Sequence, residues 1–379
     1  MENKLGIFSF FSGAGFLDLG FEKTKSYEIL FVNEIHKPFM DIYKYARKEM
    51  NINAPKFGYS LADITTFLNQ DILSKLKNNV RTAKEEYPFV GFIGGPPCPD
   101  FSVAGKNKGK EGENGKLSGT YVNLICQVQP DFFLFENVKG LYRTKKHREF
   151  FDELKTKMSK AGYSMTERLI NAIEYGAPQD RERIILIGFH KNMVKKLSLK
   201  TLGKELTDFK WGHKIYELTD ILEKQWPKTT SFLENSDSEL PNNIIEELTV
   251  QYWFNKNDVE HHPNNNQYFI PRQGLQRFLE IKEGDDKKKS YKRLHRWRYS
   301  PTAAYGNNEV HLHPYKARRL SIAEALSIQS LPKEFVLPAD VTLTNAFKAI
   351  GNGVPYIAAK ALALSIYDYI NEHLKKDKE

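Results

Sequence analysis

Cys98 is the residue whose type and setting point most clearly to chemistry. It lies in Gly94-Gly95-Pro96-Pro97-Cys98-Pro99-Asp100-Phe101-Ser102, directly after the apolar run 89–93. The two prolines restrict the backbone just before the thiol, and the carboxyl end of a strand is where α/β proteins place their ligands. A thiol held in this way is suited to nucleophilic attack. Cys126 lies instead within the apolar pattern 122–128 and is interpreted as a core residue.

Two charged motifs adjoin other apolar runs. Glu136 ends the run 132–135, where burial would raise the pKa of a carboxyl group and let it share a proton; a helix-capping or ion-paired glutamate is the alternative. The segment 179–183, Gln-Asp-Arg-Glu-Arg, precedes the run 184–189. Strand alternation places Gln179, Arg181 and Arg183 on one face, where arginines can hold a base, a phosphate or a carboxylate. An ordinary charged strand end is the alternative.

A glycine turn follows the first apolar run. It reads Phe11-Ser12-Gly13-Ala14-Gly15-Phe16, and Glu34 ends the second run about 20 residues later. Glycines let the backbone approach a ligand, and a carboxylate at this spacing suits ribose hydroxyls. The turn departs from Gly-x-Gly-x-x-Gly, which favours a sulfonium nucleoside over a dinucleotide with a pyrophosphate. An ordinary tight turn with a surface glutamate is the alternative.

The elements that position these residues alternate along the first half of the chain. Continuous apolar runs of strand length, typical of strands covered on both faces, occur at 5–11, 29–32, 89–93, 132–135 and 184–189. Helical spacing is found at 37–50, 120–129 and 147–161, with Gly162 as a stop signal, and again at 319–329 and 356–374. The alternation predicts a doubly wound α/β domain.

The chain changes character after about residue 193. The stretch to about 300 is polar and weakly periodic, and it ends in the basic run 287–298. We therefore expect three parts, namely 1–192 as the catalytic and cofactor-binding domain, 193–331 as a second, smaller domain with a hinge, and 332–379 as a segment that completes the first domain.

Composition excludes several classes of protein. The chain has 379 residues, 40% of them hydrophobic, with 56 basic and 47 acidic side chains and a net charge of 56 − 47 = +9. This apolar content supports a folded core, and the charge mildly favours an anionic partner. Two cysteines provide neither a disulfide framework nor an all-cysteine zinc site. No segment is predicted to span a membrane, so we expect an intracellular protein with free thiols and no metal.

These motifs, in this order, resemble those of the DNA cytosine-5 methyltransferase family. The resemblance continues in 318–329 and in Gly351-Asn352-Gly353-Val354, and it omits roughly 193–295. It implies an α/β fold of the S-adenosylmethionine-dependent methyltransferase type, Rossmann-like with a mixed, mostly parallel sheet, and a target-recognition domain. Three positions depart from the family pattern: Pro99-Asp100 where the family usually has Gln, Phe16 in place of a glycine, and Gly353 in place of a serine.

The resemblance also implies roles for individual residues. Cys98 would be the nucleophile that forms a covalent adduct at C6 of a flipped cytosine, Glu136 would hold the base, Arg183 would make a second base contact and Arg181 would support it. The cofactor contacts would fall on Phe11, Gly13, Ala14, Gly15, Glu34, Ile35, Asp63, Ile64, Pro96, Asn352 and Val354. We expect DNA contacts from Ser102, Lys106, Lys108, Arg293, Arg296 and Arg298.

The expected activity is methyl transfer from S-adenosyl-L-methionine to cytosine C5 in double-stranded DNA, leaving S-adenosyl-L-homocysteine. We expect a monomeric, cytoplasmic bacterial enzyme of a restriction–modification system, whose cognate endonuclease would act independently. The alternative functions are those of a transfer-RNA branch of the family, a non-catalytic binding module and an NAD-type oxidoreductase. The large insert and the sequence Cys-Pro-Asp-Phe-Ser argue against the transfer-RNA branch. The intact set of Cys98, Glu136 and Arg183 argues against a non-catalytic module. The glycine pattern argues against an NAD-type oxidoreductase.

Overall fold

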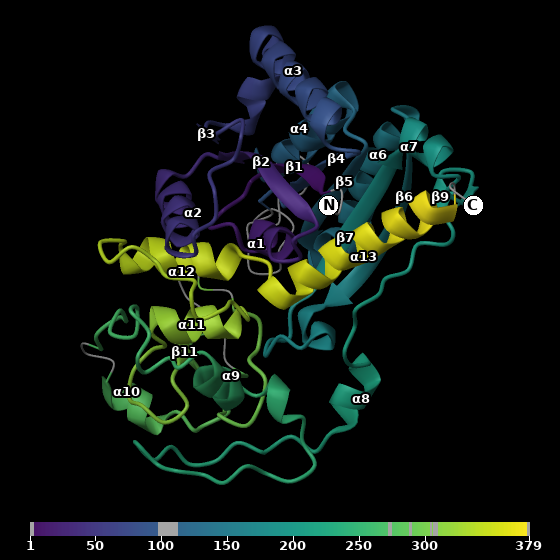
Figure 1. The fold of residues 1–379 in the computed structure, drawn as a ribbon. Coiled ribbons are helices and arrows are strands. Elements are labelled where there is room, and N and C mark those ends of the chain that lie inside the picture. Colours follow the sequence, from purple (N-terminus) through teal and green to yellow (C-terminus); the bar gives the residue numbers. More distant parts are fainter. Residues whose placement is uncertain are drawn as a thin grey trace.

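A mixed sheet forms the centre of the molecule (Figure 1). The structure is a computed structural model, and it describes residues 4–97, 113–271, 275–287, 290–303, 305 and 310–376. Its described residues form a nine-stranded sheet in the order β3-β2-β1-β4-β5-β7-β6-β9-β8. The five strands from β3 to β5 run parallel, whereas β7 runs antiparallel to both β5 and β6. This confirms the predicted α/β class with a mostly parallel sheet.

All five predicted apolar runs form strands. Their bounds are Leu5–Phe10 (β1), Tyr27–Glu34 (β2), Val90–Gly94 (β4), Phe132–Val138 (β5) and Glu182–His190 (β7). The sheet also contains strands that were not predicted, namely Tyr59–Leu61 (β3), Tyr163–Asn171 (β6), Thr201–Leu202 (β8) and Glu205–Leu206 (β9). A second, two-stranded sheet pairs Lys292–Arg293 (β10) with His311–Leu312 (β11).

Helices cover both faces of the large sheet. Phe16–Glu22 (α1), Lys37–Glu49 (α2) and Tyr356–Lys376 (α13) contribute to the apolar cluster on one face. Gln70–Glu86 (α3), Glu113–Val128 (α4) and Lys145–Lys160 (α6) contribute to the cluster on the other. Gly162 follows α6 at φ 102°, in the left-handed conformation expected for its predicted role as a stop.

The remaining elements are short. They are Ile64–Leu68 (η1), Lys139–Arg143 (α5), Ala172–Tyr175 (η3), Lys191–Lys196 (α7), Leu218–Glu223 (α8), Glu246–Leu248 (η4), Val250–Lys256 (α9), Leu275–Glu280 (α10), Ile322–Ile328 (α11) and Leu343–Asn352 (α12).

The C-terminal helices return to the start of the chain. Helix α13 lies against α1, and the Tyr27 hydroxyl donates to the carbonyl of Ala363 at 2.7 Å, across most of the sequence. Within the described residues, 343–375 is the one stretch long and apolar enough to cross a membrane by length and composition. It consists of two helices, α12 and α13, that pack mostly inside the protein, so we interpret it as core.

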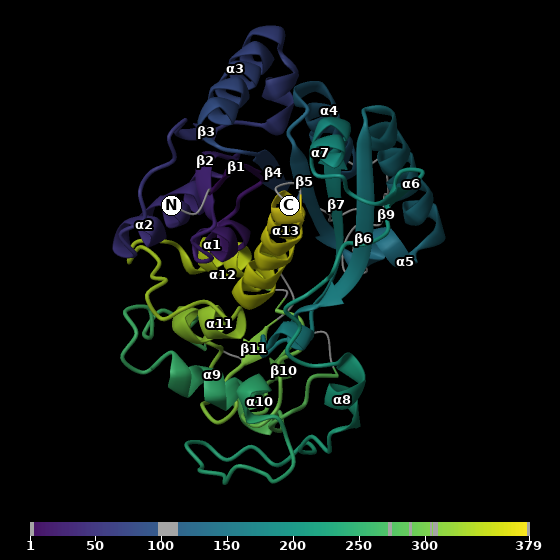
Figure 2. The same ribbon diagram turned by 45° about the vertical axis from the view of Figure 1, so that its right-hand side comes forward.

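The second part of the molecule lies below the sheet in Figures 1 and 2 and holds α8 to α10 and the small sheet. Its beginning is later than the predicted boundary at 193. Strands β8 and β9 extend the catalytic sheet, and Phe209 and Trp211 pack against its core. The predicted end at 331 also divides a packed unit, because α11 shares one apolar cluster with α1, α2 and α12. Residues of these segments therefore belong structurally to the sheet domain, and roughly 213–320 form the second part.

Candidate functional site

The acid and the arginine predicted to act together form an ion pair at the edge of the sheet. Glu136 lies near the carboxyl end of β5 and is paired in register with Ile185 of β7. Arg183 is two residues before Ile185 and so projects from the same face, as a diagonal neighbour. Its Nε lies 3.0 Å from Glu136 Oε1, and both side chains are largely buried. The antiparallel direction of β7 therefore brings a strand start to the edge where β5 ends.

The loop that leads to Cys98 begins beside this ion pair. A Cβ added to Gly95 would lie 2.5 Å from Glu136 Oε2, so only a glycine lets the chain pass this close to the carboxylate. The Asn137 side-chain amide also donates to the carbonyl of Pro96 at 3.4 Å. The first residues of the Gly-Pro-Pro segment are thus fixed against Glu136 and Asn137. Cys98 itself lies outside the described residues.

The surroundings of Glu136 bear on its protonation. Burial raises the pKa of its carboxyl group, while the Arg183 and Arg181 cations oppose that rise. A carboxyl group that holds its proton can donate from one oxygen and accept at the other. This pattern is complementary to an unprotonated ring nitrogen next to an exocyclic amine.

Arg181 is buried behind the pair. Its guanidinium donates to the carbonyls of Gly351 at 2.8 Å and Ala303 at 3.3 Å. Next to it, Gln179 donates to the carbonyl of Ile328 at 3.1 Å and to Gln329 Oε1 at 3.2 Å. Arg181 thus links the start of β7 to the second part and to the end of α12. Its positive charge lowers the pKa of the Glu136 carboxyl group, against the effect of burial.

The glycine turn and Glu34 meet at the carboxyl ends of β1 and β2. Glu34 is 7% exposed, and its two carboxylate oxygens accept from the backbone amides of Gly13 and His36, each at 2.8 Å. Phe11 and Gly13 have φ angles of 53° and 56°, and Gly15 has 81°. A positive φ at a residue such as Phe11 is uncommon and is concentrated at functional sites.

The surface around this turn fits a nucleoside. A Cβ on Gly13 would meet no atom within 4 Å, so the backbone there is open to a ligand. Ser12 Oγ is buried without a hydrogen-bond partner among the described residues. Ile35, immediately after Glu34, is 59% exposed, and Leu61, which pairs with Glu34 in register, is 51% exposed. Exposed apolar side chains beside a carboxylate suit the faces of a purine and the hydroxyls of a ribose.

The other predicted cofactor contacts lie around the same edge. Asp63 caps η1 by accepting from Thr65 N at 2.7 Å, and Ile64 is buried. Asn352 is exposed at the end of α12, and Val354 is buried two residues later. A side chain on Gly353 would overlap with the ring of Phe16. The first and last motifs of the chain are therefore in contact, whereas Ala14 is buried beneath the turn.

Arg47 supports the glycine turn and was not predicted. It is 2% exposed and donates to the carbonyls of Ala14 at 3.2 Å and Gly15 at 2.6 Å, and to Glu22 at 3.1 Å. Its guanidinium also lies 3.8 Å from the ring centre of Tyr43. In the sequence Arg47 reads as an ordinary basic residue in the last turn of a helix, and nothing in the spacing reveals that it faces inward.

Two of the arginines predicted to contact DNA lie inside the protein. Arg293 is 0% and Arg296 4% exposed. Arg293 donates to the carbonyls of Ile281, at 2.8 Å, and Lys316, at 3.1 Å, and Arg296 forms two 2.9 Å contacts with Glu283. The prediction that Arg293 and Arg296 contact DNA is therefore wrong for this structure, because their donors are engaged within the protein. Arg298 is partly exposed, and Ser102, Lys106 and Lys108 lie outside the described residues.

Known proteins share both the sequence and the fold. The family model for C-5 cytosine-specific DNA methylases matches residues 5–368. The chain is 60% identical over 377 residues to Type II methyltransferase M.NmeDI of Neisseria meningitidis serogroup C, covering 100% of this chain and 87% of that protein. It is 28% identical over 396 residues to M.FnuDI of Fusobacterium nucleatum, covering 98% and 97%.

Solved structures confirm the fold. One is a candidate DNA modification methyltransferase encoded within a prophage of E. coli, with a TM-score of 0.66 and 23% identity over 97% of this chain and 100% of that one. Another is the DNMT2 protein of Spodoptera frugiperda, with a TM-score of 0.57 and 16% identity over 96% and 100%.

The fold and the site define an S-adenosylmethionine-dependent methyltransferase. The chain belongs to the C-5 cytosine-specific DNA methylase family. It is accordingly a DNA cytosine-5 methyltransferase, which carries a methyl group from S-adenosylmethionine to C5 of cytosine in DNA.

Proposed function

We propose that this enzyme modifies cytosine in a specific duplex sequence as the protective half of a restriction–modification system. Type II methyltransferases among its relatives, one of them 60% identical over 100% of this chain, support this role. We further propose a cytoplasmic, monomeric enzyme whose cognate endonuclease acts as a separate protein.

The observation that carries the catalytic proposal is the Glu136–Arg183 pair beside the start of the Cys98 loop. Glu136 would hold N3 and the exocyclic amine of the target cytosine, which stabilises the charge that develops in the ring. Arg183 would orient the Glu136 carboxyl group and contact the base edge. Both are fixed on strands and need little rearrangement to receive a base.

Cys98 would supply the covalent step. Its thiolate attacks C6 of cytosine, a sulfur–carbon bond forms, and C5 becomes enamine-like and nucleophilic. S-adenosylmethionine bound at the glycine turn and Glu34 would supply the electrophilic methyl group to C5 and would be left as S-adenosyl-L-homocysteine. C5 then loses its proton to a base or water, and cleavage of the S–C6 bond restores the aromatic ring and the thiolate. The cytosine must leave the stacked duplex first, at a cost of a few kcal/mol.

The cofactor would rest on the edge formed by the glycine turn, Glu34 and Ile35. The open backbone at Gly13 and the partnerless Ser12 Oγ support this placement. Glu34 would accept from the ribose hydroxyls while it continues to hold the Gly13 amide. Asp63, Ile64, Pro96, Asn352 and Val354 would complete the site.

The test is methylation of plasmid DNA by the purified enzyme and by Cys98→Ala. The wild-type enzyme should produce 5-methylcytosine at one short recognition sequence, read by bisulfite sequencing. Cys98→Ala should bind DNA and S-adenosylmethionine but transfer no methyl group. DNA that contains 5-fluorocytosine should trap a covalent adduct with wild type alone, because fluorine does not leave as a proton does. Turnover by Cys98→Ala would refute the nucleophile assignment.

A further inference from the structure

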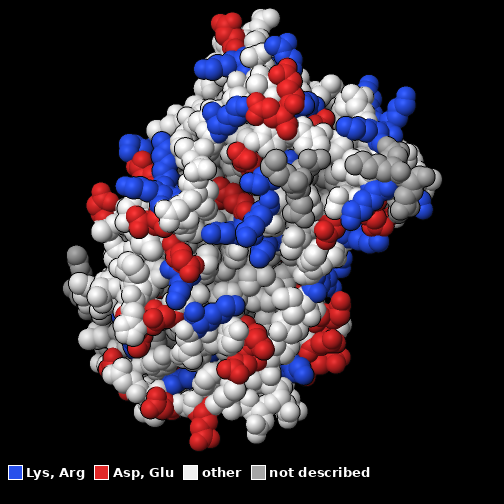
Figure 3. All heavy atoms as spheres, viewed as in Figure 1, with Lys and Arg blue, Asp and Glu red and all other residues white. Residues whose placement is uncertain are grey.

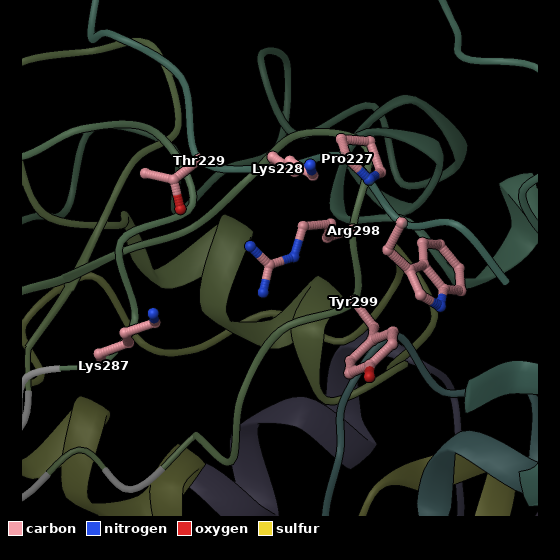
Figure 4. A pocket seen from close by; sticks show the side chains of 7 residues that line it. Pro227, Lys228, Thr229, Lys287, Arg298 and Tyr299 are labelled. Carbon is pink, nitrogen blue, oxygen red and sulfur yellow. The ribbon is translucent and has the colours of Figure 1, made fainter. Parts of the chain in front are cut away.

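The described arginines of the basic run 287–298 do not all point the same way. Arg293 and Arg296 point inward, where they hold Ile281 and Glu283 and so fix the turn that ends at Gly284. Arg298 and Lys287 point outward and line a pocket of about 440 Å³ together with Trp226, Pro227, Lys228, Thr229 and Tyr299 (Figure 4). The pocket therefore brings together two cations of this run, Lys287 and Arg298, and one lysine from a distant segment.

The pocket rests on two segments that are tied together by their backbones. Thr230 N donates to the carbonyl of Glu283 at 3.0 Å, and Thr229 Oγ1 donates to the carbonyl of Gly284 at 3.3 Å. The rings of Trp226 and Tyr299 meet edge to face, with centroids 5.2 Å apart, and form an apolar wall. These contacts hold the two segments that carry the cations in fixed positions relative to each other.

Arg298 is anchored with donors to spare. Its Nη1 donates to the carbonyl of Gly284 and its Nη2 to Asp286 Oδ2, both at 3.2 Å. A guanidinium has five N–H donors in a fixed fork, so three remain for a ligand. In Figure 4 the guanidinium points toward the side where Thr229 and Lys287 lie.

The two lysines are exposed, and neither forms an ion pair or a side-chain hydrogen bond with another residue that the structure describes. Asp286 offsets one positive charge, which leaves an excess of two at the pocket. An excess of cations with free donors beside a hydroxyl suits an anion with several oxygens.

The position of the pocket in the molecule indicates which anion it binds. Tyr299 precedes Ser300, whose backbone bonds Pro178 and Asp180 at 2.8 and 2.9 Å, just before β7. Arg183 is four residues beyond Gln179, or roughly 13 Å along an extended strand. A duplex that delivers a base to Glu136 and Arg183 would therefore pass close to the pocket.

Accordingly, we propose that Lys228, Lys287 and Arg298 form a binding site for the backbone phosphates of the DNA substrate. This inference rests on the proposed function and adds a DNA contact from the second part of the molecule. Such contacts position the duplex and are independent of base sequence.

The experiment compares DNA binding of the full-length enzyme with that of Lys228→Ala/Lys287→Ala, using a mixed-sequence duplex. Each phosphate contact contributes about 0.9 to the slope of log affinity against log salt, so the double variant should lose about 1.8. Between 50 and 200 mM salt, wild type should therefore weaken about ten-fold more than the variant does. Arg298→Lys, which keeps the charge but loses the fork, should lower affinity with a smaller change of slope.

Lys75→Ala/Lys77→Ala is the matched control. Both lysines are exposed on α3, at the far end of the molecule from the second part (Figure 1), and their removal changes the net charge equally. This control should retain the wild-type slope. Equal slopes in wild type and the pocket variant, or the same decrease in both double variants, would overturn the inference.

Methylation distinguishes this inference from the proposed function. The pocket variant should modify the same cytosines as wild type, at a rate restored by low salt. A changed set of modified cytosines would show base readout and would overturn the assignment to phosphate. Absence of methylation in wild type would refute the proposed function, whereas the salt slopes would still report on the pocket.

Discussion

At the scale of single residues, the site depends on charges placed where water is scarce. Glu136 and Arg183 are both largely buried and 3.0 Å apart, so each side chain is held by the other. The sequence indicated both residues, because each adjoins an apolar run typical of a strand. It did not indicate their contact, since five apolar runs do not reveal which strand lies next to which.

Replacing Glu136 by Gln should separate binding from catalysis. The amide keeps the size of the side chain and can still donate and accept hydrogen bonds, but it cannot transfer a proton to N3 and has no negative charge to pair with Arg183. We expect kcat to fall by about 10²–10³-fold, as for loss of one group that stabilises developing charge. Radiolabelled methyl transfer measures kcat, and calorimetry should find the affinity for S-adenosylmethionine close to that of wild type. A variant with normal kcat would remove Glu136 from the mechanism.

Arg47 shows what sequence alone does not reveal. Its side chain reaches across the buried interior to the carbonyls of Ala14 and Gly15 and to Glu22. Only the packing of α2 on the turn decides that this arginine is buried. A helical pattern read from the sequence assigns basic residues to the solvent side.

Arg47→Met should destabilise the fold and weaken cofactor binding together. The change leaves the Glu22 carboxylate buried without its cation, which costs about 3–5 kcal/mol. Chemical denaturation measures the free energy of unfolding, and calorimetry measures the dissociation constant of S-adenosylmethionine. Tyr43→Phe, which removes one hydrogen bond to Asp18, is the milder control and should cost about 1 kcal/mol. Wild-type cofactor affinity in a folded Arg47→Met protein would contradict a role in positioning the turn.

At the scale of elements, strands with continuous apolar runs were predictable and mixed ones were not. β6 has the polar centre Thr166-Glu167-Arg168, and Glu167 is paired with Arg148 and Lys155 of α6. These residues form no continuous apolar run, because tertiary ion pairs, rather than burial, satisfy the polar centre of the strand. β8 and β9 have two residues each and carry no periodic signal.

Helix α11 directly follows the second part, and its start depends on a buried acid. Glu324 is 1% exposed, caps the helix with Ser321, and accepts from Arg318 at 2.7 and 2.8 Å. Burial alone would raise the pKa of Glu324, but the cationic partners His313 and Arg318 outweigh burial and hold the pKa below its usual value of 4.5. The folded state therefore binds this proton less tightly than the unfolded state.

Stability from Glu324 is present above pH about 4.5 and is lost as the pH falls toward the depressed folded value. Glu324→Gln should lose about 3 kcal/mol at pH 7, because Arg318 remains buried without its partner. Thermal melts between pH 3.5 and 7 should show a flatter acid limb for the variant. Parallel curves for the two proteins would contradict this role of Glu324.

At the scale of the whole molecule, segments far apart in the sequence complete one sheet domain. Helix α13 covers the sheet face beside α1, and the Gly353 turn meets Phe16. The resemblance anticipated this discontinuity, whereas the extent of the second part required the structure. The net charge of +9 carries little information by itself, because Lys and Arg interleave with Asp and Glu over the face in Figure 3.

Two glycine-to-alanine changes test this closure. A Cβ on Gly20 of α1 would lie 2.6 Å from Ala359 Cβ and 2.7 Å from backbone atoms of α13, whereas a Cβ on Gly119 of α4 meets nothing within 4 Å. Gly20→Ala should destabilise by about 1–3 kcal/mol through overpacking. Gly119→Ala should stabilise by about 0.5–1 kcal/mol through helix propensity. Urea denaturation gives both values, and a Gly20→Ala protein as stable as wild type would show that α13 can move away from α1.

The contact between Gly188 and Phe133 inside the sheet affects the sheet edge that carries Glu136 and Arg183. Gly188 of β7 pairs with Phe133 of β5, and a side chain there would overlap with the Phe133 ring. Gly188 lies five residues from Arg183, roughly 16 Å along the strand. If β7 slipped by one residue to relieve that overlap, Arg183 would project from the opposite face, away from Glu136. With the roles proposed for Glu136 and Arg183, selectivity for a base would thus depend in part on strand alignment, and a substitution far from any substrate atom would impair catalysis.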